Sequence, residues 1–217
     1  MKFGIFYELQ LPRPWNDGDE HRLYLNALDQ LELADRLGYD HAWQVEHHFL
    51  EEYSHSPAPE SFLAAASQRT RKIRLGHGIY QLTTNHPARV AERVATLDLL
   101  SSGRCEFGMG ESASITELEP FGVNMENKRE VFEEAVRAIL EAHSPTHAVV
   151  DLKLGGASGL ACVELLHAHD PRTVIVVLTG YASIGTAVEA IKLGACHYLA
   201  KPSNTDDIEA AFRKVAG

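Results

Sequence analysis

The sequence predicts a mixed α/β protein of seven βα units, whose mostly parallel sheet is curved as an incomplete TIM-like barrel. The first observation behind this prediction is that short β-rich runs alternate with longer amphipathic runs along all 217 residues. Such alternation is typical of parallel strands joined by right-handed crossovers. The second observation is the length of the chain, because seven units of about 31 residues each match the usual size of a βα unit. Seven units are one short of a closed barrel, so we expect one curved sheet with sequential strand order.

The expected strands are short runs rich in β-branched and other apolar residues, bounded by glycine or polar residues. They are Lys2–Tyr7, His41–Val45, Ile73–Ile79, Arg104–Met109, Ala148–Leu152, Val174–Thr179 and His197–Ala200.

The expected helices lie between these strands and follow a helical apolar period. They are Arg22–Leu37, Glu60–Arg69, Pro87–Leu100, Lys128–Glu141, Gly159–His169, Ser183–Leu193 and Thr205–Val215. Pro87 suits a first helical turn, and the Ser183 side chain can cap the helix that it begins. Gly38, Gly103 and Gly194 follow helical runs, as expected where the chain leaves a helix in a left-handed conformation.

Composition and charge exclude several classes of protein. The formal net charge of −10 argues against nucleic-acid binding, which needs clustered Lys and Arg. No apolar run approaches the roughly 18 residues of a membrane span, and the first residues lack the features of a signal peptide. Three separated cysteines indicate a reducing compartment, so we expect a cytoplasmic protein. Its histidines lack zinc-site spacing, so no metal site is expected.

An acid and two histidines follow the second expected strand, in the run Glu46–His47–His48. Side chains at the carboxyl ends of parallel strands face the site of an α/β protein, so this group could handle protons. The spacing alone favours the commoner case, in which these are hydrogen-bonded polar side chains at the start of a loop. Both interpretations stay open on spacing alone.

Several separated motifs of the first 140 residues resemble the bacterial luciferase-like monooxygenase family. They are MKFGIFYELQ, WQVEHHF, RLGHGIYQLTTNHPARVAERVATLDLLSSGRCEFGMG and ELEPFGVNMENKREVFEEA, in the order in which the family has them. The resemblance implies a (β/α)8 barrel that binds reduced FMN or a deazaflavin and activates oxygen. It places the family's active-site histidine at His47, with Glu46 and His48 as its neighbours. We regard these three as the vestigial catalytic residues.

Two departures from this family bear on cofactor binding. The chain has Gly110–Glu111–Ser112 where luciferases carry a basic residue just after the fourth strand. The family also places most of its flavin phosphate contacts in the second half of the barrel, which has no counterpart here. We therefore expect no tightly bound cofactor, and any binding of FMN to be weak.

Three later strands deliver an acid, a hydroxyl and an amine to one edge of the sheet: Asp151, Thr179 and Lys201. An aspartate can form an acyl phosphate, and a hydroxyl and an ammonium can bind phosphoryl oxygens. The motifs VVDLKLGGASGL, VVLTGYAS and YLAKPSNTDDI resemble the last three βα units of a response-regulator receiver domain. The resemblance implies a phosphoacceptor at Asp151, a switch hydroxyl at Thr179, the lysine at Lys201 and an aromatic switch at Tyr198.

A receiver begins with a strand that ends in the acidic pair that holds Mg²⁺, and that strand has no counterpart in this chain. Without the metal, a phosphoryl group beside Asp151 would lose its main charge neutralisation. We therefore expect this second site to be vestigial as well, with weak Mg²⁺ binding.

The two resemblances meet inside one expected helix, and we place a splice within residues 131–142. Because no low-complexity linker divides the chain, we expect residues 1–217 to form one fused α/β domain. It would combine a half-barrel fragment, residues 1–140, with a flavodoxin-like receiver fragment, residues 141–217. We interpret the molecule as an engineered chimera without evolved function. The alternatives are residual flavin binding or monooxygenase activity, and a phosphoacceptor signalling module.

Three structural expectations follow from these assignments. His47, Glu111, Asp151, Thr179 and Lys201 should lie on one rim, with Lys201 paired to Asp151. Unpaired sheet edges predict a homodimer.

The two families also carry characteristic cis peptide bonds. Their relatives lead us to expect cis bonds at Lys201–Pro202 and at Gly78–Ile79.

Overall fold

The computed structural model describes residues 2–154, 157–180, 184–203 and 205–215. The chain forms two compact units, Lys2–Lys128 and Arg129–Gly217. The expected α/β class with parallel, sequentially ordered strands is confirmed. The expectation of one seven-stranded sheet is wrong for the described residues, because their parallel strands pair into a four-stranded and a three-stranded sheet.

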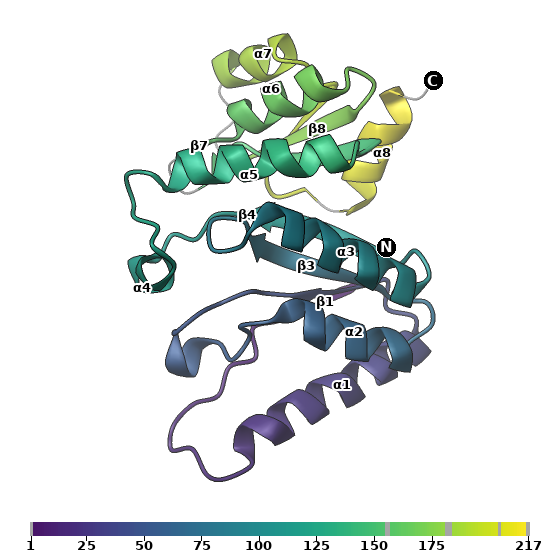
Figure 1. Cartoon of the computed structure of the whole chain (residues 1–217). Helices are drawn as coiled ribbons and strands as arrows, with labels where there is room; N and C mark the ends of the chain where they lie inside the picture. Colours follow the sequence, from purple (N-terminus) through teal and green to yellow (C-terminus); the bar gives the residue numbers. More distant parts are fainter. Residues whose placement is uncertain (1, 155–156, 181–183, 204, 216–217) are drawn as a thin grey trace. The chain divides into compact units, whose positions relative to one another are not determined.

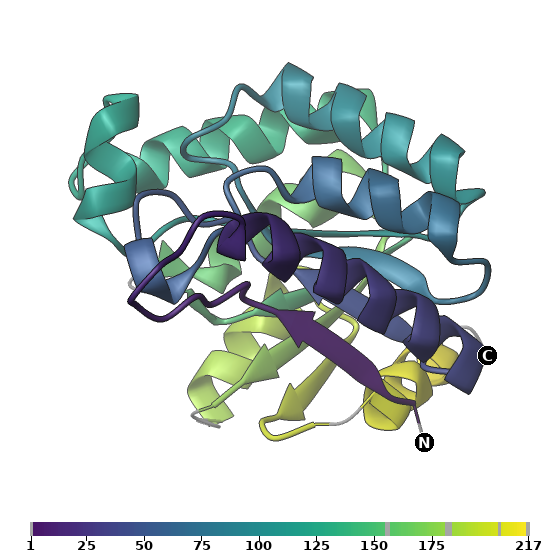
Figure 2. The same cartoon turned by 90° about the horizontal axis from the view of Figure 1, so that it is seen from below.

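The first unit is a run of four βα steps around a sheet of order β1-β2-β3-β4, in which every pair is parallel. Helices α1, α2 and α3 lie along the same side of this sheet (Figure 1 and Figure 2). The strands are β1 (Gly4–Tyr7), β2 (His41–Gln44), β3 (Arg74–Gln81) and β4 (Cys105–Gly110). The helices are α1 (Asp19–Leu37), η1 (Glu51–Tyr53), α2 (Pro59–Arg69), α3 (Pro87–Ser101), α4 (Ile115–Leu118), η2 (Glu119–Phe121) and α5 (Lys128–Ala142). The boundary between the two units falls at the start of α5, after Lys128.

The core of the first unit lies between the sheet and these helices. Leu31 of α1, Leu63 of α2 and Leu75 of β3 are fully or almost fully buried there. Burying each such side chain contributes roughly 1.5–3 kcal/mol, so this layer accounts for much of the stability of the unit. The opposite side of the sheet carries the Trp43 indole, which lies so close to Gly76 that a Cβ there would collide with the ring.

A carboxylate fixes the connection between α2 and β3. Asp35, near the end of α1, accepts hydrogen bonds from the backbone N–H groups of Arg71, Lys72 and Ile73, at 3.0, 2.7 and 2.7 Å. Burial tends to raise the pKa of Asp35, but these three bonds outweigh it and lower that pKa. The acid therefore ties the end of one helix to the start of the strand that carries much of the pocket described below.

The second unit contains a parallel sheet of order β5-β8-β9 and a two-residue antiparallel pair, β6 with β7, that the sequence did not predict. Buried Ile175, Val176 and Val177 of the central strand form its core with Val163 and Ala211. The elements are β5 (His147–Asp151), β6 (Lys153–Leu154), β7 (Ala157–Ser158), α6 (Gly159–His169), β8 (Val174–Thr179), α7 (Ile184–Lys192), β9 (His197–Ala200) and α8 (Thr205–Val215). The predicted cap Ser183 lies outside the described residues.

The expected cis bonds at Gly78–Ile79 and Lys201–Pro202 are both present, together with an unexpected one at Arg13–Pro14. Among the described residues, β1 and β4 each pair on one side only, and so do β5 and β9. A homodimer formed through these edges stays a prediction.

Candidate functional site

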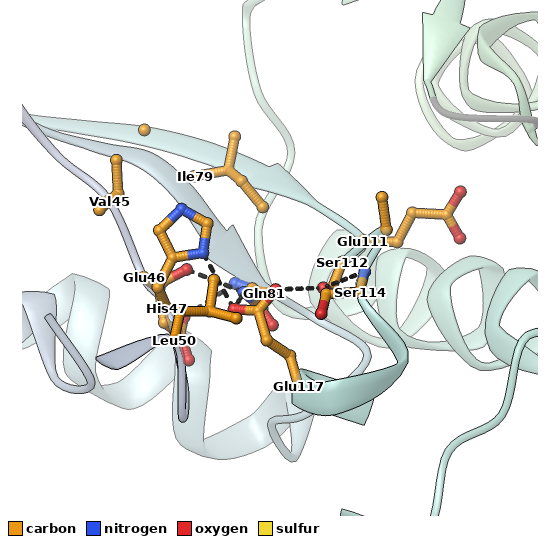
Figure 3. A pocket seen from close by; sticks show the side chains of 12 residues that line it. Val45, Glu46, His47, Leu50, Ile79, Gln81, Glu111, Ser112, Ser114 and Glu117 are labelled. Atoms are coloured by element: carbon orange, nitrogen blue, oxygen red, sulfur yellow. Dashed lines mark hydrogen bonds and ion pairs between the residues drawn. The ribbon is translucent and has the colours of Figure 1, made fainter. Parts of the chain in front are cut away.

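A pocket of about 370 Å³ lies where β2, β3 and β4 end, at the carboxyl edge of the first sheet. This is the edge at which α/β proteins hold their ligands. Figure 3 shows the pocket from close by. Val45, Leu50 and Ile79 give it apolar walls, and its polar lining comes from Glu46, His47, Gln81, Glu111, Ser112, Ser114 and Glu117.

Glu117 is the centre of the polar network in this pocket, although it is only 3% exposed. Its Oε1 accepts hydrogen bonds from His47 Nδ1 at 2.9 Å, from the His48 backbone N–H at 3.0 Å and from Gln81 Nε2 at 2.8 Å. Its Oε2 accepts a bond from the Ser112 hydroxyl at 2.6 Å. Burial opposes ionisation, but these bonds outweigh it and lower the pKa of Glu117 to about 2.

The ionised Glu117 fixes the tautomer of His47. A carboxylate can only accept, so Nδ1 of His47 carries the proton of the shared hydrogen bond. In the neutral ring Nε2 is then the acceptor, and it lies 3.6 Å from Glu8 Oε2, beyond hydrogen-bonding distance. The His47 side chain remains 23% exposed. A ligand in the pocket can therefore meet a ring nitrogen whose role is already set.

A second histidine–carboxylate pair lies beside the first. His48 Nε2 is 2.9 Å from Glu46 Oε1, and the same oxygen accepts a bond from Asn85 Nδ2 at 2.7 Å. The other oxygen, Glu46 Oε2, accepts the backbone N–H of Gln81 at 2.8 Å. Glu46 therefore bridges the ends of β2 and β3 and holds the start of the histidine loop, which makes its role largely structural.

Glu111, at the end of β4, is a buried carboxylate whose side chain is 4% exposed. Neither of its oxygens has a hydrogen-bond partner, and its Oε1 lies 3.7 Å from Lys128 Nζ. The Lys128 ammonium is also buried and donates to the Ser112 carbonyl at 3.1 Å. Glu111 and Lys128 thus form an ion pair with little access to water.

The structure brings the predicted Glu46, His47 and His48 together in one site, while their catalytic role stays a prediction. Sequence reasoning missed Glu117 and Gln81, which orient His47. Glu117 lies within the ELEPFGV motif that supported the family resemblance, so its place in that motif was the available signal.

In the second unit, Asp151 and Thr179 end the neighbouring strands β5 and β8, and Lys201 directly follows β9. The predicted pair is confirmed: Lys201 Nζ lies 2.5 Å from Asp151 Oδ2. The backbone N–H of Lys201 donates to the Thr179 carbonyl at 2.8 Å, which holds the two strand ends together. The Tyr198 hydroxyl is buried. Phosphoacceptor chemistry at these residues stays a prediction.

The expected common rim of His47, Glu111, Asp151, Thr179 and Lys201 would join residues of both units and also stays a prediction. Among the described residues, no helix is long and apolar enough to cross a membrane. The same residues contain no cluster of three or more potential metal ligands.

Comparison with known proteins assigns the two parts of the chain to different families. Residues 1–150 match the luciferase-like monooxygenase family, and residues 124–213 match the response regulator receiver domain. The two matches overlap over residues 124–150, which include α5.

Relatives and solved structures support both assignments. Limonene 1,2-monooxygenase of Rhodococcus erythropolis is 38% identical over 64% of this chain and 35% of its own length. The acid tolerance regulatory protein ActR of Sinorhizobium medicae is 49% identical over 38% of this chain and 44% of its own length. The structure of monooxygenase RslO1 from Streptomyces bottropensis is similar with a TM-score of 0.65 and 28% identity, covering 100% of this chain and 66% of that one.

The chain spans less than half the length of the curated relatives it matches. Its first unit carries a preorganised histidine–carboxylate site at the edge where that family's fold places function. The chain belongs to the luciferase-like monooxygenase family, and its last part is that of a response-regulator receiver domain.

Proposed function

We propose that the first unit binds the ring system of a flavin in the pocket at the ends of β2, β3 and β4, with His47 as its proton-handling residue. The observation that carries this proposal is the bond from His47 Nδ1 to the buried, ionised Glu117, because it leaves Nε2 available to a ligand. An orienting carboxylate behind a histidine is a common arrangement in general acid–base catalysis.

The residues of the pocket fit such a ring. Val45, Leu50 and Ile79 offer apolar surface to a flat aromatic system, and His47 offers a polar atom at its edge. A bound reduced flavin would supply the electrons for a reaction with oxygen. The protein would contribute binding, exclusion of water by the apolar walls, and a proton held or accepted at His47 Nε2.

The proposal is limited to the ring because this chain spans 35% of the length of the limonene monooxygenase and 40% of that of protein y4wF from Sinorhizobium fredii. A complete oxygenation reaction needs the substrate surface and phosphate contacts of a whole barrel. We therefore expect weak flavin binding and little turnover.

Lumiflavin, which is the flavin ring without its ribityl chain, tests this proposal directly. We expect saturable quenching of its fluorescence by the full chain, and saturable absorbance changes when the reduced ring is titrated without oxygen. Ala113→Trp should abolish both, because Ala113 is an exposed residue that lines the pocket and the indole would fill it. Ala88→Trp, on exposed α3 surface, is the matched control and should bind normally. Absence of saturable binding, or equal binding by Ala113→Trp, would contradict the proposal.

A phosphoacceptor at Asp151 is the second candidate function, and the contact of 2.5 Å between Asp151 and Lys201 favours it. Incubation of the full chain with acetyl phosphate and Mg²⁺ should then add the mass of one phosphoryl group. Asp151→Asn should prevent this addition, and Asp206→Asn, on the exposed side of α8, should not. The alternative, an engineered chimera without function, predicts no response in either the flavin or the phosphate experiment.

A further inference from the structure

The pocket of the first unit is lined by several acidic side chains. Its twelve lining residues include Glu46, Glu111 and Glu117 but neither lysine nor arginine. A fourth carboxylate, Glu8, lies 3.6 Å from His47 Nε2. Phosphate sites in proteins are built from arginine, lysine and free backbone N–H groups, so this lining is the opposite of an anion site.

One of these carboxylates, Glu117, is charged at neutral pH. Glu117 keeps its charge because four hydrogen bonds lower its pKa to about 2. The Glu46 carboxyl accepts hydrogen bonds from the Gln81 backbone and the Asn85 amide at the same end of the pocket. An anion that enters the pocket therefore meets the negative charge of Glu117, and the other acidic side chains of the lining offer it no hydrogen-bond donor.

Among the residues that the structure describes, Lys128 is a buried cation near the pocket, and it is already paired. Lys128 Nζ lies 3.7 Å from Glu111 Oε1 and donates to the Ser112 carbonyl, so its charge is offset inside the protein. Figure 3 shows Glu111 at the end of the pocket away from His47. Glu111 thus lines the end that a ligand tail would reach if its ring lay against His47.

We propose that this pocket takes a flavin without a phosphate group, such as riboflavin, and discriminates against FMN, with Glu111 as the residue that determines this specificity. The inference rests on the proposed binding of the flavin ring. Like charges repel more strongly where water is partly excluded, and no lysine or arginine of the described residues lines this pocket to compensate a phosphate. Riboflavin should bind at least about tenfold more tightly than FMN.

The decisive experiment titrates riboflavin and FMN separately into the full chain and follows fluorescence quenching. Glu111→Gln keeps the size of the side chain but removes its charge, which leaves the positive charge of Lys128 uncompensated. In this variant the ratio of the FMN affinity to the riboflavin affinity should rise about tenfold. The matched control, Glu119→Gln, removes an exposed charge outside the pocket lining and should keep the preference of the parent chain.

Salt gives a second measurement that needs no substitution. The preference for riboflavin should shrink as salt rises from about 0.05 M to about 1 M, because counter-ions screen the repulsion. Equal affinities for riboflavin and FMN at low salt, in a chain that binds lumiflavin, overturn this inference alone. Failure of lumiflavin, riboflavin and FMN alike overturns the proposed function with it. An unchanged ratio of the two affinities in a folded Glu111→Gln variant rejects Glu111 as the determinant.

Discussion

At the scale of single residues, Glu117 and His77 of the first unit have depressed pKa values for different physical reasons. Glu117 is ionised because donors surround its carboxylate and outweigh the effect of burial, which lowers its pKa to about 2. His77 is fully buried in β3, and its burial lowers the pKa to about 4 by disfavouring the charged ring. One group is held charged and the other neutral, and each makes the protein sensitive to acid in its own pH range.

Acid should destabilise the first unit through His77. The pKa of this histidine is about 4 in the folded protein and 6.5 when the ring is free, so the unfolded chain binds its proton first as pH falls. The free energy of unfolding should therefore drop between pH 6.5 and pH 4, by about 2–3 kcal/mol at pH 4.5. His77→Leu should lose less stability over this range in urea unfolding followed at several pH values. Parallel pH profiles for the two proteins would contradict this assignment.

Glu117 should set the tautomer of His47, which nitrogen NMR of the labelled protein can read. In the parent chain we expect neutral His47 to carry its proton on Nδ1, because Glu117 Oε1 accepts from that atom. Glu117→Gln, which weakens this bond by removing the charge, should give a mixture of both tautomers. Glu119→Gln, an exposed change two residues away, should leave the signals of His47 as they are. A single Nδ1–H tautomer in Glu117→Gln would show that other contacts orient the ring.

The residues of the site could be predicted only in part from the sequence. Glu46, His47 and His48 stand together after one strand, so their common position could be inferred from the motif. Glu117 lies 70 positions from His47, and only the packing of α4 against the strand ends brings its carboxylate to the ring. The pairing of Glu111 with Lys128 likewise depends on where α5 begins.

At the scale of elements, alternation and periodicity located each expected strand and helix core but not the pairing of strands. The structure begins α1 at Asp19, three residues before the predicted Arg22, after Gly18 in a left-handed conformation. It also contains the short β6–β7 pair, whose two-residue strands are too brief to show an alternating pattern. The split into two sheets was missed because apolar runs identify strands without specifying which strands are neighbours.

The connection between α2 and β3 should depend on Asp35. Asp35→Ala removes the acceptor of three backbone N–H groups and should lower the free energy of unfolding by about 2–4 kcal/mol. Asp29→Ala is the matched control on the same helix, since Asp29 pairs with Arg69 at the surface and is 68% exposed. That change should cost less than about 1 kcal/mol. Urea unfolding of the three proteins measures both effects, and equal losses would refute the role given to Asp35.

At the scale of the whole molecule, the separate hydrogen-bonded sheets and cores of the two units predict that they unfold in separable steps. The chain supplies a convenient probe, because both tryptophans, Trp15 and Trp43, belong to the first unit. Tryptophan fluorescence therefore follows that unit, whereas circular dichroism follows both. A single fused domain, which the sequence led us to expect, would instead give one transition by both methods.

Two core substitutions decide between these outcomes. Leu31→Ala and Ile175→Ala each leave a cavity at a fully buried position, the first in the first unit and the second in the second unit. Each should lower the free energy of unfolding of its own unit by about 2–5 kcal/mol. Only Leu31→Ala should lower the urea midpoint seen by tryptophan fluorescence, because the contacts of Ile175 lie in the other core. Ile175→Ala should lower only the transition that remains in circular dichroism. If Ile175→Ala shifts the tryptophan transition as far as Leu31→Ala does, the two sheets share one cooperative core and the single-domain expectation holds.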